Sequence, residues 1–152
     1  MANSYTSFVL MIPKLTKKEV EWLKQEVSCP EEEFDTWDEE KQQAWLTAHS
    51  VDEVTYWPDF GFVASKEGSR WTAEFFSEEA GSINNVCDVL QRYLNAFHPD
   101  RHISFEWAFT CSARRLGEFG GGAAFITAKK IHYLHTADWL TKKAKQWEGR
   151  NP

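Results

Sequence analysis

The sequence predicts a single α+β domain in which an antiparallel sheet is backed by helices. The chain has 152 residues, of which 42% are hydrophobic and 15% aromatic, and this is enough to build one buried core. Segments with strand-like alternation and segments with helical periodicity follow one another in the order β-α-(α)-β-β-α-β-β-α. The first six regular elements, without the inserted helix, have the order of a ferredoxin-like, split β-α-β arrangement. No repeat or linker divides the chain, so we expect residues 1–152 to form one domain.

The first strand and the first helix have clear boundaries. Residues 5–13 form a β-branched and aliphatic run that ends at Pro13, which predicts a buried strand. Thr16 and Glu19 have the spacing of a capping box, and apolar residues follow at helical intervals. We therefore expect a helix over about 17–27.

Residues 31–54 are a strongly acidic segment that we interpret as a helical insertion between the first helix and the second strand. Thr36 and Glu39 have capping-box spacing, and acidic residues in a first turn interact favourably with the helix dipole. A further short turn is expected to begin at Ser50. The residues predicted to share one helical face are Trp37, Lys41, Ala44, Trp45 and Ala48.

The middle of the chain predicts a hairpin, a helix and a strand. Strands over 60–66 and 70–77 flank a glycine-containing turn, Ser82 is placed to cap a helix, and residues 103–111 alternate between apolar and polar. On the helix, the expected apolar side consists of Ile83, Val86, Cys87, Leu90, Leu94 and Phe97. On the last strand it consists of Ile103, Phe105, Trp107, Phe109 and Cys111.

The C-terminal region predicts an additional strand or hairpin and a final helix. Residues 122–135 fit either one long strand or a tight hairpin about Lys129 and Lys130. A helix is expected over about 137–147, with its apolar residues turned toward the core. Those residues are Leu140, Ala144 and Trp147.

Charge is unevenly distributed along the chain, whose formal net charge is −6. Residues 1–80 contain 7 Lys and Arg against 17 Asp and Glu, a balance of −10, and residues 81–152 contain 10 against 6, a balance of +4. The acidic first half argues against direct binding of nucleic acid, because such binding depends on Lys and Arg contacts to phosphates.

The three consecutive glycines of the stretch "RRLGEFGGGAAFITA" offer a candidate anion site. Exposed backbone N–H groups of Gly120, Gly121 and Gly122 could hold a phosphate or carboxylate, with charge supplied by Arg114 and Arg115. The alternative is that the glycines only allow a bulge or a close approach of strands. Because the surroundings lack the pattern of a dinucleotide or phosphate-binding loop, we favour this structural interpretation.

Catalytic and metal-binding motifs are weak in this sequence. Cys29, Cys87 and Cys111 have no zinc-site spacing, and the five histidines form no metal-ligand motif. We predict no catalytic residues, metal or cofactor. The expected location is the reducing cytoplasm, with free thiols and no membrane association, because we recognise no signal peptide or membrane-spanning run.

The acidic insertion is the strongest functional feature. We expect a small non-enzymatic protein that docks on another macromolecule as an adaptor or inhibitor. A protein is the expected class of partner. Charge would steer the encounter, and aromatic side chains would anchor it. The predicted contact residues are Glu31, Glu32, Glu33, Asp35, Trp37, Asp38, Glu39, Glu40 and Trp45.

Four alternatives stay open at this point. The acids could imitate the phosphates of a nucleic acid, or they could be a solvated helix face without a partner. The loop from Arg114 to Gly122 could bind a phosphorylated or anionic small molecule, with or without catalysis. The acidic first half and the basic second half could also pair between subunits in a homo-oligomer.

Overall fold

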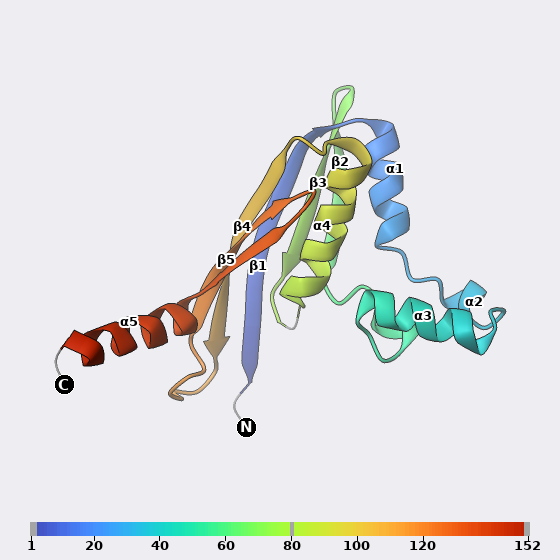
Figure 1. Ribbon diagram of the computed structural model, residues 1–152. Helices are drawn as coiled ribbons and strands as arrows, with labels where there is room; N and C mark the ends of the chain where they lie inside the picture. The colour runs from blue at the N-terminus through green and yellow to red at the C-terminus, as the bar shows by residue number, and fades with distance from the viewer. Residues whose placement is uncertain (1–2, 80, 151–152) are drawn as a thin grey trace.

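The computed structural model describes residues 3–79 and 81–150, and over these residues the chain is an α+β fold with a six-stranded antiparallel sheet and five α-helices (Figure 1). The elements in chain order are β1 (Ser4–Leu15), α1 (Lys17–Glu26), α2 (Glu31–Phe34), α3 (Glu39–His49), the short 3-10 helix η1 (Val54–Tyr56), β2 (Gly61–Glu67), β3 (Arg70–Ser77), α4 (Ile83–Phe97), β4 (His102–Cys111), β5 (Gly120–Thr127), β6 (Ile131–His135) and α5 (Thr136–Arg150).

The sheet has the strand order β2-β3-β1-β4-β5-β6, and all neighbouring strands are antiparallel. Of the two possibilities for residues 122–135, the structure has the hairpin. Its turn is closed by a hydrogen bond from the Thr127 N–H to the Lys130 carbonyl at 2.9 Å. The hairpin adds β5 and β6 to the sheet beyond β4, and it places α5 at the edge.

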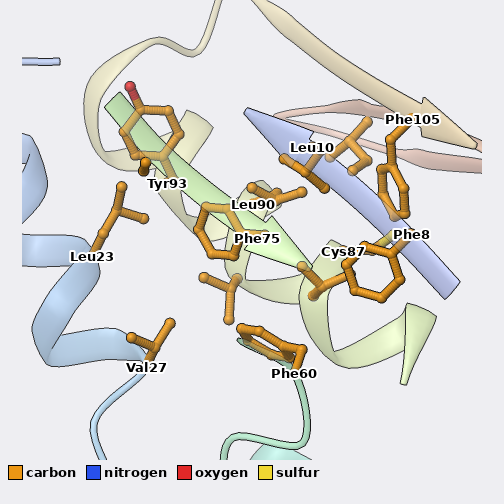
Figure 2. Packing of buried hydrophobic residues seen from close by; sticks show 14 of the residues in the cluster. Phe8, Leu10, Leu23, Val27, Phe60, Phe75, Cys87, Leu90, Tyr93 and Phe105 are labelled. Carbon is orange, nitrogen blue, oxygen red and sulfur yellow. The ribbon is translucent and has the colours of Figure 1, made fainter. Parts of the chain in front are cut away.

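One face of the sheet is covered by α1 and α4, and the core lies between these two layers (Figure 2). The strand predicted over residues 5–13 is present as β1, but it is buried on one face only, because Phe8 and Leu10 are buried whereas Val9 and Met11 are exposed. On β3 the buried side chains are Ala73 and Phe75. Burial of such side chains stabilises the fold by about 1.5–3 kcal/mol each. The helix side of the core consists of Val20, Leu23, Val27, Val86, Cys87, Val89, Leu90, Tyr93 and Leu94.

The helix starts agree with the sequence except in the insertion. The capping box of Thr16 and Glu19 and the Ser82 cap are confirmed. Thr36 does not cap α3: the helix begins two residues later than that spacing suggests, and the Asp38 carboxylate accepts the cap hydrogen bond from the Lys41 N–H at 2.8 Å. Asp38 is as good a cap as Thr because its carboxylate also suits the helix dipole.

Two further expectations in the insertion are wrong because α3 begins and ends at other residues than the sequence suggests. Trp37 precedes α3, so it does not share a helical face with Lys41 and the residues that follow it. Ser50 begins no new turn; with φ of +54° it ends α3 in the left-handed conformation common at helix C-termini. The next turn, η1, begins only at Val54.

The predicted inward side of the C-terminal helix is wrong. Leu140 and Trp147 are exposed by 61% and 68%, and Ala144 is exposed as well. The cause is the connection, because α5 begins at Thr136, directly after β6 ends at His135. With no residue available for a reversal, the helix continues away from the sheet (Figure 1).

The apolar side of β4 is also shorter than predicted. Phe105 and Trp107 are buried, but Phe109 is exposed by 39%. Its partners across the ladders are Thr6 and Gly120, neither of which is buried, so this end of the sheet lies outside the main core.

Candidate functional site

The seven carboxylates of the insertion lie on its surface. Glu31, Glu32 and Glu33 form most of α2, Asp35 and Asp38 lie between the helices, and Glu39 and Glu40 form the first turn of α3. All seven side chains are exposed, and the ion pairs found within residues 3–79 and 81–150 include none of them. The lysine-bearing α5 lies on the opposite side of the molecule, so its charges do not neutralise this segment (Figure 1).

Three of these carboxylates border a groove between the end of α1, α2 and α3, which we call the acidic groove. Its volume is about 850 Å³. The side chains of Trp37 and Trp45, both half-buried, contribute to its wall. The residues that line it are Gln25, Glu26, Ser28, Cys29, Pro30, Glu31, Glu32, Glu33, Trp37, Trp45, Ala48, His49 and Arg92.

A continuous series of ring contacts connects the insertion to the core. Phe34 lies 5.9 Å from Trp45, Trp45 stacks on His49 at 4.0 Å, and His49 lies 4.7 Å from Trp57 between ring centroids. Trp57 then contacts Phe60 at 5.6 Å. Each such pair contributes on the order of 0.5–1.5 kcal/mol beyond the area it buries, so the series holds α2 and α3 in place.

The tryptophans therefore divide into two groups. Trp57 is only 2% exposed and belongs to the core, where its indole N–H donates to the Glu26 carbonyl at 3.2 Å. Trp37 and Trp45 are half-buried and expose only part of their rings. Of these tryptophans, only Trp37 and Trp45 could anchor a partner, and only through the parts of their rings that line the groove.

An arginine and a histidine, Arg92 and His49, also line the groove. Arg92, from α4, donates from Nε to the Glu26 carboxylate at 3.0 Å, while its Nη2 is buried and has no acceptor among the described residues. Burial lowers the pKa of His49 below 6.5, and a hydrogen bond to the Trp45 carbonyl at 2.8 Å only partly opposes this shift. The imidazole is therefore neutral near pH 7, with Nδ1–H as the donor.

The glycine run has a steric explanation. A Cβ atom at Gly122 would collide with the Leu134 carbonyl oxygen and the Trp107 indole, and one at Gly121 would collide with the Trp107 carbonyl oxygen. The close approach of β4, β5 and β6 therefore requires glycine here. This agrees with the structural interpretation of these residues.

The cavity beside the glycines has an acidic lining. It encloses about 510 Å³ next to Gly117, Gly120 and Gly121, and its charged lining residues are Glu79, Glu118 and Asp138. Arg114 and Arg115 are exposed on the preceding loop and do not line it. Three carboxylates disfavour an anion in this cavity, which weakens the case for a phosphate there.

A buried polar cluster that the sequence did not indicate connects α1 to the end of α4. Glu19, predicted only as a capping residue, accepts hydrogen bonds from the Thr16 N–H at 2.7 Å and the Tyr93 hydroxyl at 2.9 Å, and it contacts His98 Nε2. Burial alone would raise the pKa of Glu19, but these hydrogen bonds lower it to about 2. His98 is 79 residues away along the chain, so no local pattern could reveal the contact.

The remaining chemistry-bearing residues do not converge. Over residues 3–79 and 81–150, no three His, Cys, Asp or Glu side chains lie together as metal ligands. Cys29, Cys87 and Cys111 are free thiols, and burial raises the pKa of Cys87 to about 12, which makes it a poor nucleophile. None of the described helices is both long and apolar enough to cross a membrane.

Comparison with protein-family models, curated proteins and solved structures found no match to this chain.

Proposed function

We propose that this protein acts by binding another protein through the acidic groove, as an adaptor or inhibitor. The observation that carries the proposal is the combination of three exposed glutamates, Glu31, Glu32 and Glu33, with two partly exposed indoles around one groove of about 850 Å³. Carboxylates without ion-pair partners attract a basic surface over about 8–10 Å at physiological salt, and the groove provides a place for it to be buried.

The geometry favours a basic peptide segment as the partner. The side chain of Lys41 already lies over the Trp37 ring at 4.3 Å, so this face of the insertion accepts a cation over an indole. Lysine or arginine side chains of a partner would be bound by Glu31–Glu33, whose exposed side chains border the groove. A nucleic acid does not suit such a rim, because its phosphates would meet like charges.

We also propose that the sheet and its covering helices are a ferredoxin-like core with additions. The strand order β2-β3-β1-β4, with α1 and α4 on one face, supports this assignment. In this interpretation, the acidic helices lie in the first β-to-β connection, and β5, β6 and α5 extend the C-terminal side.

The experiment compares two variants with equal change in net charge. In the groove variant, Glu31, Glu32 and Glu33 are replaced by Gln; in the control variant, the exposed carboxylates Glu21, Glu78 and Asp100 are replaced by Gln or Asn. Calorimetric titration with a peptide of alternating lysine and leucine should give the same Kd for wild type and control. The groove variant should bind about tenfold more weakly or worse.

Recovery of partners from a cell extract provides the second measurement. We expect wild type and control to retain the same protein, identified by mass spectrometry, and the groove variant to lose it. Equal retention by all three proteins, together with equal peptide affinities, would show that the groove is not the docking site.

A further inference from the structure

The C-terminal helix α5 has an apolar stripe that its own chain does not cover. All fifteen of its residues are exposed, including Trp139 by 51% and Leu140 by 61%. Isolated helices of this length are marginally stable in water, so helices in proteins depend on packing of an amphipathic face. The start of α5 is fixed by a hydrogen bond from the Gly121 N–H to the Thr136 hydroxyl at 3.0 Å, which directs the helix away from its own sheet.

The face of the sheet opposite α1 and α4, which we call the open face, also exposes several large apolar side chains among polar ones. Because side chains alternate along strands, the open-face residues of β1 are those between the buried Phe8 and Leu10, and the register extends this face across the sheet. The largest exposures on it are Val9 at 62% and Met11 at 60%. Its other exposed large apolar residues are Val63, Phe125 and Leu134.

The two surfaces have opposite charge. The side of α5 that carries Trp139 and Leu140 also carries the cations Lys143 and Arg150, whereas Lys142 and Lys145 fall on the opposite side of the helix. The open face carries Glu74, paired in register with Val63 and Met11, and Glu106, paired with Ala123. Pairing of α5 with another α5 would bring like charges together, whereas pairing of α5 with the open face brings these cations to glutamates.

The dimensions also agree. A helix of 15 residues is about 22 Å long. A sheet of six strands at spacings of about 4.8 Å is about 24 Å wide. One α5 can therefore lie across the whole open face.

We propose that this protein forms a homodimer in which α5 of each copy packs across the open face of the other. Trp139 and Leu140 would bury against Val9, Met11 and Phe125, and Lys143 and Arg150 would pair with Glu74 and Glu106. In a reciprocal exchange each copy donates its α5 and accepts that of the other, which closes the assembly as a twofold dimer. This contact is separate from the acidic groove, because α2 and α3, which border that groove, lie on the other side of the molecule from α5 (Figure 1).

The first test is the mass of the full-length protein by sedimentation velocity across a wide range of concentration. Wild type should be dimeric at the higher concentrations. The variant with Trp139→Ser and Leu140→Ser should dimerise at least about tenfold more weakly. Leu116→Ser is the matched control, because Leu116 is fully exposed on the loop before β5 and should leave the Kd unchanged. A monomeric wild type, or a dimer that is indifferent to the α5 substitutions, would overturn the proposal.

Charge reversal then identifies the paired surfaces. Lys143→Glu with Arg150→Glu should weaken the dimer, and so should Glu74→Lys with Glu106→Lys, because Lys143 and Arg150 lie on the same side of α5 as Trp139 and Leu140. The four substitutions together should restore it, because the charges are again complementary, and circular dichroism checks that every variant is folded. Failure of the combined variant to regain affinity would exclude the pairing of α5 with the open face.

Discussion

The acidic insertion and α5 are both helical additions outside the main core, yet they are attached in opposite ways. The insertion directs its aromatic residues inward, so that Phe34, Trp45 and His49 lead ring by ring to the buried Trp57. Helix α5 also contains tryptophan, but Trp139 is half exposed and contacts Lys143 of its own helix at 5.6 Å. One addition is held by the core, and the other is exposed over its whole length.

The difference comes from the connections rather than from composition. The insertion occupies the long connection between α1 and β2, which has enough chain to turn back and place Trp57 against Phe60. No residue separates β6 from α5. A helix that begins directly at a strand end cannot reverse onto the same sheet, whatever its amphipathic pattern.

The largest expected effect tests the anchor of the insertion. Trp57→Ala should lower the free energy of unfolding by about 3–5 kcal/mol, because it empties a site in the core and removes the ring that connects His49 to Phe60. Trp139→Ala, measured in dilute solution where a dimer would dissociate, should change it by less than about 0.5 kcal/mol. Urea unfolding followed by circular dichroism measures both, and similar losses would contradict the contrast between the two regions.

A smaller effect is expected where α5 joins the sheet. Gly122→Ala should destabilise the protein by about 1–3 kcal/mol, because its Cβ would meet the Leu134 carbonyl and the Trp107 ring. Gly149→Ala, in α5 with open space around it, should be neutral or stabilising by up to about 1 kcal/mol. Thermal unfolding of the two variants gives the comparison, and a tolerated Gly122→Ala would refute the steric role of the glycine run.

The smallest effect is a pH dependence confined to the insertion. The pKa of His49 is lowered by burial, so the unfolded chain binds this proton more readily than the folded chain. The contribution of neutral His49 to stability is complete above the unfolded pKa near 6.5 and decreases as the pH falls below it. Tryptophan fluorescence between neutral and mildly acidic pH should report the change at Trp45, which stacks on His49.

A His49→Gln variant serves as the control for this titration. It removes the titrating group while it keeps a side chain that can donate to the Trp45 carbonyl. Its fluorescence should be flat over the same pH range, and an unchanged transition would assign the signal to another group.

The sequence predicted elements well where the periodicity was strong and the partners were local. The cap at Thr16, the hairpin from β2 to β3 and the apolar side of α4 all depend on residues within a few positions of one another. The predicted start of α3 was wrong because two nearby residues, Thr36 and Asp38, can both cap a helix, and in the structure Asp38 does so. Phe109 alternates in step with the buried Phe105 and Trp107, but it lies at the end of the sheet outside the main core. The pattern within β4 therefore does not reveal its exposure.

The candidate site was predicted in part. The density of carboxylates from Glu31 to Glu40 marked the segment, and the structure places Glu31–Glu33 at one groove with Trp37 and Trp45. The sequence analysis missed the contact of Arg92 with Glu26 and that of Glu19 with His98, because each contact joins residues dozens of positions apart. Contacts of that kind leave no periodic signal in a single sequence.

By itself, the sequence determined the α+β class, the acidic character of the insertion and the amphipathic nature of α1 and α4, because hydrophobic periodicity and capping act over one or two turns of chain. Only the tertiary structure decided which apolar faces are covered. That outcome depends on connection length and strand order, which bring Trp57 into the core and leave large apolar side chains of the open face and of α5 exposed.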